Sequence, residues 1–299
     1  MRYIFSVILA LSCTVSGMCE LPSVAAGTLE RHKLYSESLR RDVTVDVWMP
    51  DSYETAGTGL PVLYMHDGQN VFDPAVTWNH QAWEVDNVTD SLVRAGVITA
   101  PLVVAIHSVD STRISDLAPT AVREYAGVYA DSLGRFSDME LRGREYAEFV
   151  TGTLKPFIDS TYNVLTDRDN TAVMGSSMGG LISLYMICEY PEVFGGAACL
   201  STHWPGDATV GSHFPEAMLA YMDARLPDAA AHRLYFDYGT GAYDINYAPW
   251  QPKADAVAMR HGYVPGVNFC SFVDYGATHN EDAWSRRVYI PLKFLFHKN

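Results

Sequence analysis

Cysteine is scarce in this sequence, and its placement argues against cross-linking or metal binding. Beyond the N-terminal segment the cysteines are Cys188, Cys199 and Cys270, an odd number, and each lies in an apolar stretch. This pattern predicts buried free thiols rather than a disulfide framework. No spacing of cysteine and histidine matches a zinc motif. We therefore expect no metal and no organic cofactor.

Positive charge is scarce as well. The 21 lysines and arginines face 35 aspartates and glutamates, which gives a formal net charge of −14. An acidic surface argues against nucleic acid or an anionic membrane as the main partner. The sequence also lacks internal repeats and low-complexity tracts. Its 299 residues suffice for one large domain with a substantial core.

Long apolar runs are missing except near the N-terminus, where residues 4–15 follow Arg2. Such a run is too short to span a bilayer and is typical of an export signal. We expect residues 1–26 to form a signal peptide and residues 27–299 to form a single domain. The protein is then periplasmic, extracellular or an outer-membrane lipoprotein.

The cleavage point of this signal stays open between two readings. Val24-Ala25-Ala26 offers small residues, although it lies far behind the apolar run. Leu11-Ser12-Cys13 is a loose lipoprotein signal, in which Cys13 would carry a lipid. Any membrane anchoring is therefore expected through an N-terminal lipid only.

What the sequence does contain is a regular alternation of strand and helix patterns. Apolar and β-branched runs predict strands at residues 28–36, 41–49, 61–65, 102–106, 171–174, 196–200, 233–238 and 267–273. Helical periodicity predicts helices at residues 84–95, 143–160, 178–190, 214–226, 252–261 and 281–296, with a kink at Pro156 and an interruption at Pro291. This alternation implies an α/β fold with a mostly parallel sheet covered by helices on both faces.

One short stretch, residues 171–180, joins a predicted strand to a predicted helix and reads TAVMGSSMGG. Within it, Gly175-Ser176-Ser177-Met178-Gly179 matches the G-x-S-x-G pattern of a nucleophile elbow. In that turn Ser177 would stand at the top of the sheet, and the Met178 N–H would point at a developing oxyanion. A Gly/Ser turn that serves packing alone is the alternative.

A serine nucleophile needs a base and an acid, which follow it in the order Ser, acid, His in α/β hydrolases. Ser177, Asp244 and His279 satisfy this order, and each follows a predicted strand. Asp237, which ends a strand, is the alternative acid. The loop after residue 65 contains Gln69, whose N–H is a candidate second oxyanion donor, with an ordinary polar loop as the alternative.

Several motifs of the chain resemble the esterase D superfamily of α/β hydrolases over roughly residues 28–297. This superfamily includes feruloyl, acetylxylan and enterochelin esterases, S-formylglutathione hydrolases and mycolyltransferases. The motifs that carry the resemblance are VLYMHDGQNVFD at 62–73, Arg113-x-x-Asp116-Leu117-x-Pro119, LKPFID at 154–159, VMGSSMGGLISL at 173–184 and YPEVFG at 190–195.

The resemblance implies an α/β-hydrolase fold with Ser177 as the nucleophile and His279 as the base. It implies oxyanion donors at Met178 and Gln69. The family acid follows a Gly-Thr pair after the penultimate strand, and Gly239-Thr240 therefore points to Asp244.

Aromatic residues in the predicted loops are candidate substrate contacts. Trp78, Trp204, Tyr243 and Trp250 would suit a sugar ring or a hydroxycinnamoyl group. His203 stands where the family often has Ser-Pro-Ser-x-Trp, so either a substrate contact or a structural role is expected of it.

The expected function is therefore a secreted serine carboxylic-ester hydrolase that works through an acyl-enzyme. Export favours acylated carbohydrate as its substrate, as feruloyl or acetyl esters of polysaccharide or oligosaccharide. The alternatives are a siderophore esterase, a general short-chain esterase or an acyltransferase of the same fold. A non-catalytic binding protein is a further alternative, which an intact Ser, Asp, His order disfavours.

Overall fold

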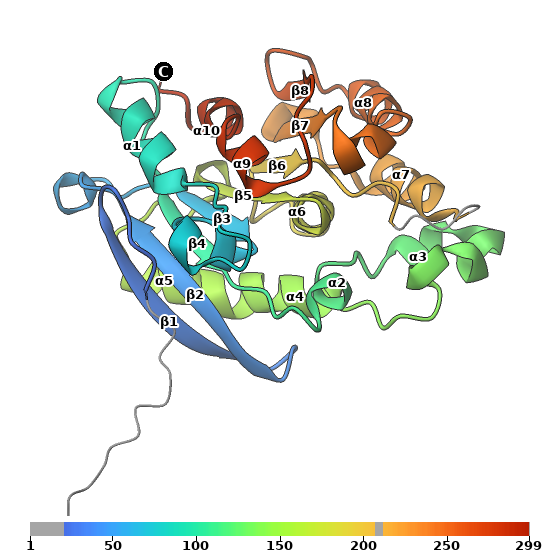
Figure 1. Cartoon of the computed structure of the whole chain (residues 1–299), viewed down its shortest axis with the longest axis horizontal. Coiled ribbons are helices and arrows are strands. Elements are labelled where there is room, and N and C mark those ends of the chain that lie inside the picture. The colour runs from blue at the N-terminus through green and yellow to red at the C-terminus, as the bar shows by residue number, and fades with distance from the viewer. Residues whose placement is uncertain (1–20, 207–211, 299) are drawn as a thin grey trace, which may run out of the picture.

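A computed structural model describes residues 21–206 and 212–298, and these form one eight-stranded sheet (Figure 1). The strand order is β1-β2-β4-β3-β5-β6-β7-β8. Their bounds are β1 Thr28–Ser36, β2 Arg41–Met49, β3 Val62–His66, β4 Leu102–Ile106, β5 Thr171–Ser176, β6 Gly196–Leu200, β7 Arg233–Gly239 and β8 Phe269–Asp274.

The sheet is parallel from β4 to β8 and antiparallel at its β1–β2 edge. β1 pairs antiparallel with β2, and β2 pairs antiparallel with β4. The pairs β3–β4, β3–β5, β5–β6, β6–β7 and β7–β8 are parallel. Every residue of β3, β4, β5 and β6 is buried, as expected of strands covered on both faces. The predicted mostly parallel α/β sheet is confirmed.

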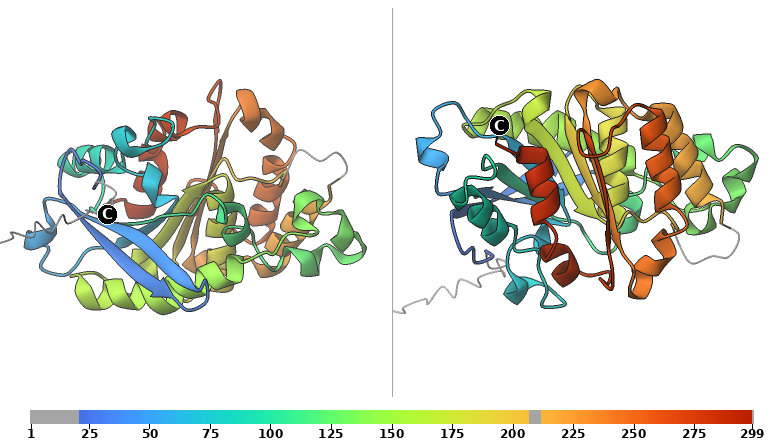
Figure 2. Two further views of the ribbon diagram at one scale, coloured as in Figure 1. Left: turned by 60° about the horizontal axis from the view of Figure 1, so that its bottom comes forward. Right: turned by 90° about the horizontal axis from the view of Figure 1, so that it is seen from above.

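Helices cover the two faces of the sheet in two layers (Figure 2). Their bounds are α1 Val85–Arg94, α2 Arg113–Asp116, α3 Val122–Tyr125, α4 Gly143–Phe149, α5 Lys155–Thr161, α6 Met178–Glu189, α7 Phe214–Arg225, α8 Gln251–Arg260, α9 Glu281–Ser285 and α10 Tyr289–Phe296. Alternate side chains of β3 therefore face the two layers. Val62 and Tyr64 belong to the hydrophobic core under α4 to α8, and Leu63 and Met65 belong to the core under α1, α9 and α10.

Two prolines do not interrupt their helices where the sequence analysis expected. Between α4 and α5 the chain forms a π-helical turn at Val150–Leu154, and Pro156 follows in the first turn of α5. The last helix breaks at residues 286–288, before Pro291, which lies in the first turn of α10. Pro291 is tolerated because an amide hydrogen in the first turn of α10 has no helical acceptor, whereas Pro156 directly follows a π-helical turn within a helical run that is unbroken from 143 to 161.

The expected signal peptide falls largely on residues 1–20, which lie outside the described residues. Its last part, residues 21–26, lies against the domain. The Ala25 N–H donates to Asp86 Oδ2 at 2.7 Å, and Trp48 Nε1 donates to the Ala26 carbonyl at 2.8 Å. Within residues 21–206 and 212–298, no helix is both long and apolar enough to cross a membrane.

Candidate active site

The turn between β5 and α6 holds Ser177 in a strained backbone conformation. Its φ of 57° and ψ of −119° are sparsely populated for a residue with a side chain, as expected of an elbow. The Ser177 N–H is fixed by the Leu200 carbonyl of β6 at 3.0 Å. A Cβ at Gly175 would lie 2.8 Å from the carbonyl carbon of Gly179, whereas one at Gly179 would meet its nearest neighbour at 3.4 Å. The sharp turn therefore requires glycine at Gly175, whereas Gly179 has room for a Cβ.

The structure brings Asp244 and His279 together from the loops after β7 and β8. His279 Nδ1 lies 2.5 Å from Asp244 Oδ1, and the Asp244 side chain is fully buried. Burial alone would raise the pKa of Asp244, but the hydrogen bond and charge of His279 hold it below its ordinary value. A carboxylate held in this way fixes the orientation of the imidazole and leaves Nε2 free for another partner.

Asp237, the alternative acid, is engaged elsewhere. Its carboxylate receives two hydrogen bonds from Arg287, at 3.0 Å each, and one from the Tyr235 hydroxyl at 2.9 Å. All three side chains are buried. The geometry therefore selects Asp244 as the carboxylate that serves His279.

Ser201 connects these two carboxylates, and sequence reasoning did not single it out. Its hydroxyl donates to Asp244 Oδ2 at 2.7 Å and accepts from Trp284 Nε1 at 3.0 Å and Arg287 Nη2 at 2.9 Å. The Gly239 N–H adds a second donor to Asp244 Oδ2 at 2.7 Å. The only available signal was position, since Ser201 directly follows β6 at the edge where β5 and β7 also end.

Ser177 and His279 both line a cavity of about 500 Å³. Ser177 is 8% exposed and lines this cavity. The other walls are mainly polar and indole side chains, among them Gln69, Trp78, Asn79, Gln81, Arg113 and Trp284. Such a mixture suits a polar, uncharged ligand that also offers a flat face.

The two expected oxyanion donors follow the ends of two neighbouring strands, β3 and β5. Met178 is the first residue of α6, so its N–H has no acceptor within the helix. Gln69 lies in the 3-10 turn Gly68–Asn70 after β3, which pairs directly with β5. The Gln69 side chain is tied to Ser108 by two hydrogen bonds of 2.8 and 3.1 Å, which fixes this turn beside the elbow.

A half-buried ion pair also holds this turn in place. Arg113 Nε and Nη2 each donate to the Asp67 carboxylate at 2.7 Å. Burial would raise the pKa of Asp67, but the Arg113 charge and hydrogen bonds hold it below its ordinary value. Asp67 itself has a left-handed backbone with a φ of 55°, so the ion pair helps to hold a strained corner.

The expected aromatic contacts divide into two groups. Trp78 lines the cavity and is 84% exposed, so it is free to meet a ligand. The expectation for Trp204 is wrong, because its side chain is 0% exposed and Nε1 donates to Gln251 Oε1 at 2.8 Å in the core. Trp250 packs on the same core and under Lys253, and it does not line the cavity.

His203 and Tyr243 lie behind the imidazole of His279 rather than in the cavity wall. The ring of Tyr243 stacks on His203 with centroids 5.7 Å apart and meets His279 edge-on at 5.5 Å. Both ring nitrogens of His203 have partners within the protein, the Tyr247 hydroxyl and the Gly206 carbonyl. His203 therefore has no free nitrogen for the substrate contact that was considered for it.

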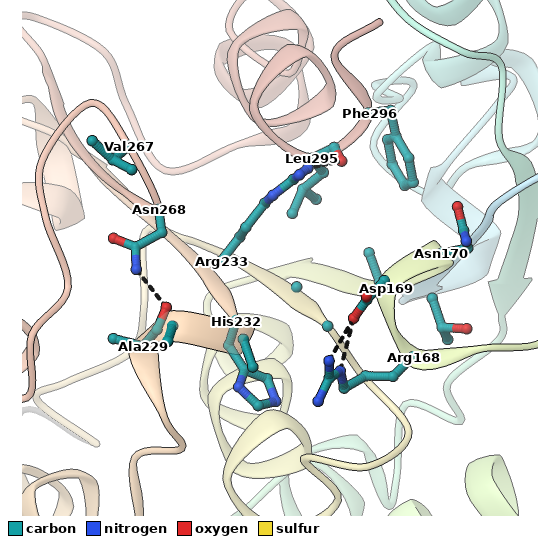
Figure 3. A pocket seen from close by; sticks show the side chains of 16 residues that line it. Arg168, Asp169, Asn170, Ala229, His232, Arg233, Val267, Asn268, Leu295 and Phe296 are labelled. Carbon is teal, nitrogen blue, oxygen red and sulfur yellow. Dashed lines mark hydrogen bonds and ion pairs between the residues drawn. The ribbon is translucent and has the colours of Figure 1, made fainter. Parts of the chain in front are cut away.

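A second cavity, of about 530 Å³, lies at the opposite edge of the sheet, where β5, β6 and β7 begin (Figure 3). Arg168 there is paired with Asp169, and Asn268 donates to the Ala229 carbonyl. No serine or cysteine lines it. Ligands of α/β sheets bind at the carboxyl ends of the strands, which favours the cavity at Ser177.

Within the part of the chain that the structure describes, no cluster of histidine, cysteine and carboxylate side chains could hold a metal ion.

Comparison with known proteins agrees with this geometry. The family model "Putative esterase" matches residues 36–287. The uncharacterized protein YbbA of Bacillus subtilis is 25% identical over 279 residues, which cover 91% of this chain and 98% of that protein. An endo-1,4-beta-xylanase/feruloyl esterase of Xylanibacter ruminicola is 24% identical over 198 residues, covering 64% of this chain and 22% of that protein.

Solved structures share the fold at low identity. A ferulic acid esterase superposes with a TM-score of 0.64 at 19% identity, covering 91% of this chain and 98% of that one. The enterobactin esterase FES of Shigella flexneri also gives 0.64, at 18% identity, covering 92% of this chain and 60% of that one. The family model spans most of the domain, including the elbow and His279. The chain therefore belongs to this esterase family and is a carboxylic ester hydrolase with the α/β-hydrolase fold.

Proposed function

We propose that the protein hydrolyses esters through an acyl-enzyme on Ser177. His279 Nε2 takes the hydroxyl proton as Ser177 Oγ attacks the ester carbonyl, and His279 then protonates the departing alcohol. Water repeats the sequence on the acyl-enzyme and releases the acid. The single observation that carries this proposal is that His279, which is hydrogen-bonded to Asp244 at 2.5 Å, lines the same cavity as the strained elbow residue Ser177.

The other residues have supporting tasks in this mechanism. Asp244 keeps the His279 tautomer and stabilises the imidazolium that forms in each half-reaction. The N–H groups of Met178 and Gln69 bind the oxyanion of the tetrahedral intermediate. The two donors and the serine follow the ends of the adjacent parallel strands β3 and β5, which places them at the same edge of the sheet.

We further propose that the substrate is an acylated carbohydrate and that the enzyme is exported. Trp78 offers a stacking face at the cavity mouth, and Asn79 and Gln81 offer carboxamides for hydroxyl groups. A relative that carries a feruloyl esterase supports this class of substrate. The apolar run at residues 4–15 supports export.

The test compares kcat/KM for a sugar-linked feruloyl or acetyl ester with that for the matching methyl ester. Contacts to the sugar that persist in the transition state should give a ratio of about tenfold or more, or about 1.4 kcal/mol. Trp78→Ala should remove most of this ratio and leave turnover of p-nitrophenyl acetate nearly intact. Trp250→Ala, which alters a tryptophan outside the cavity, is the control and should keep the ratio.

Two outcomes would replace the carbohydrate proposal. A ratio near one with good turnover of a catecholate siderophore lactone would favour a siderophore esterase, the class of one solved structural neighbour. Transfer of the acyl group to added sugar in place of water would favour an acyltransferase. Either result leaves the proposed roles of Ser177, Asp244 and His279 intact.

A further inference from the structure

The hydroxyl of Tyr247 is buried against the residues proposed for catalysis. Tyr247 Oη lies 3.4 Å from His279 Nδ1 and 3.2 Å from His203 Nδ1. Tyr247 is 0% exposed and comes from the turn Ala242–Tyr247, the turn that also supplies Asp244. One hydroxyl therefore contacts both His203 and the proposed base His279.

The direction of each hydrogen bond follows from the chemistry of the partners. His203 Nε2 lies 2.8 Å from the Gly206 carbonyl, which can only accept, so Nε2 carries a hydrogen. Burial lowers the pKa of His203 to about 4, so the ring is neutral at pH 7. Its Nδ1 must then be an acceptor, and the only hydrogen available for it is that of the Tyr247 hydroxyl.

Because Tyr247 donates to His203, its oxygen presents lone pairs to His279. We propose that His203 and Tyr247 form a hydrogen-bonded pair that aims the Tyr247 oxygen at His279 and so stabilises the imidazolium formed during acyl transfer. The hydrogen bond from His203 Nε2–H to the Gly206 carbonyl makes His203 Nδ1 a stronger acceptor for the Tyr247 hydroxyl. That stronger bond in turn increases the negative charge on the Tyr247 oxygen. Tyr247 contacts the proposed base His279, and His203 is a positioning residue that acts through Tyr247. The proposal rests on the proposed roles of Ser177 and His279.

Stacking holds this pair in place. Tyr243 lies parallel to the His203 ring, with an interplanar angle of 18°, and Tyr247 meets His279 with centroids 5.7 Å apart. Trp284 contacts the His279 ring edge-on at 5.0 Å. The imidazole of His279 is therefore enclosed by aromatic rings, and the Tyr247 oxygen adds a second acceptor beside Asp244 on its Nδ1 side.

The test is a double-mutant cycle of Tyr247→Phe and His203→Phe, read as kcat and KM on p-nitrophenyl acetate. Tyr247→Phe removes the oxygen and keeps the ring, so kcat should fall about tenfold with KM nearly unchanged. His203→Phe removes the acceptor and lets the hydroxyl hydrogen turn toward His279, so it should cost at least as much. The double variant should be no slower than the slower single variant, because His203 acts only through the hydroxyl.

Independent losses that multiply in the double variant would overturn the proposal, and so would an unchanged kcat in Tyr247→Phe. His203→Gln keeps an acceptor oxygen and should recover part of the loss. If His203→Phe fails to fold, the test uses His203→Gln, whose kcat should be higher than that of Tyr247→Phe. A kcat of His203→Gln that is no higher than that of Tyr247→Phe would overturn the proposal. The matched control is His213→Phe, because His213 stacks on Tyr129 and does not line the cavity. Its kcat and KM should equal those of the unmodified protein. Full activity of Ser177→Ala would reject the proposed function instead, so the two failures are distinguishable.

Discussion

Asp244 divides its two carboxylate oxygens between two tasks. Oδ1 faces His279, and Oδ2 is held by Ser201 and the Gly239 N–H. A buried carboxylate with both oxygens satisfied keeps one orientation and stays ionised. Asp237 is equally buried, but Arg287 neutralises it, so its role is to fix the core beneath the site. Burial alone therefore does not distinguish the two aspartates, whereas their partners do.

Exchange of each aspartate for asparagine should separate these roles. Asp244→Asn should lower kcat by about 10⁴-fold, because an amide in place of the carboxylate favours the wrong histidine tautomer. Asp237→Asn removes the carboxylate that accepts two hydrogen bonds from the buried Arg287 and leaves only carboxylates at 3.6 and 4.0 Å to pair with it, so it should lower the free energy of unfolding by about 3 kcal/mol and reduce kcat far less. Steady-state kinetics and urea denaturation measure the two effects. A larger loss of kcat in Asp237→Asn than in Asp244→Asn would identify Asp237 as the carboxylate of the catalytic triad.

At the scale of elements, the sequence predicted the framework well and the surroundings of the site poorly. Strands such as Leu102–Ile106 and Gly196–Leu200 match their predicted bounds because a short apolar run is a local signal. The burial of Trp204 was not predictable, since a loop tryptophan packs inward or outward according to distant neighbours such as Gln251. Ser201 and Tyr247 were missed for the same reason, because their partners lie on other loops.

The elbow offers a test of how tightly an element end is packed. Gly175→Ala should destabilise the fold by about 1–3 kcal/mol, because a Cβ 2.8 Å from Gly179 forces the strand and helix apart. It should also lower kcat by displacing Ser177. Gly152→Ala is the matched control, since nothing lies within 4 Å of its Cβ, and a helical site there should gain a few tenths of a kcal/mol. Denaturation curves in which the two variants shift stability equally would contradict this reading.

Over the whole molecule, negative charge is in excess, yet several buried carboxylates are individually paired. Asp46 shows this at the antiparallel edge, where Arg31 of β1 donates to it at 2.6 and 2.7 Å and His107 lies 2.8 Å away after β4. Burial would raise the pKa of Asp46, but these partners hold it below its ordinary value. The ion pair therefore ties the β1–β2 edge to the parallel sheet.

A lowered pKa in the folded state makes this contribution depend on pH. The stabilisation by Asp46 is present in full above the unfolded pKa of about 3.9 and is lost as the pH falls through the folded value. Asp46→Asn should therefore lower the free energy of unfolding by about 3 kcal/mol at pH 7. This gap in unfolding free energy between the variant and the unmodified protein should shrink below about pH 4. Asp42→Asn, on the same strand but exposed, should change little. Urea denaturation at several pH values measures the gap, and a gap independent of pH would refute the ion-pair account.

The measurement that tests the central claim most directly is mass spectrometry of the protein after reaction with a fluorophosphonate or a slow p-nitrophenyl ester. We predict one covalent adduct, located on Ser177, that is absent in Ser177→Ala and retained in Ser176→Ala. Ser177→Ala should also lose several orders of magnitude in kcat. An adduct on Ser176, or ester turnover that continues in Ser177→Ala, would contradict the account.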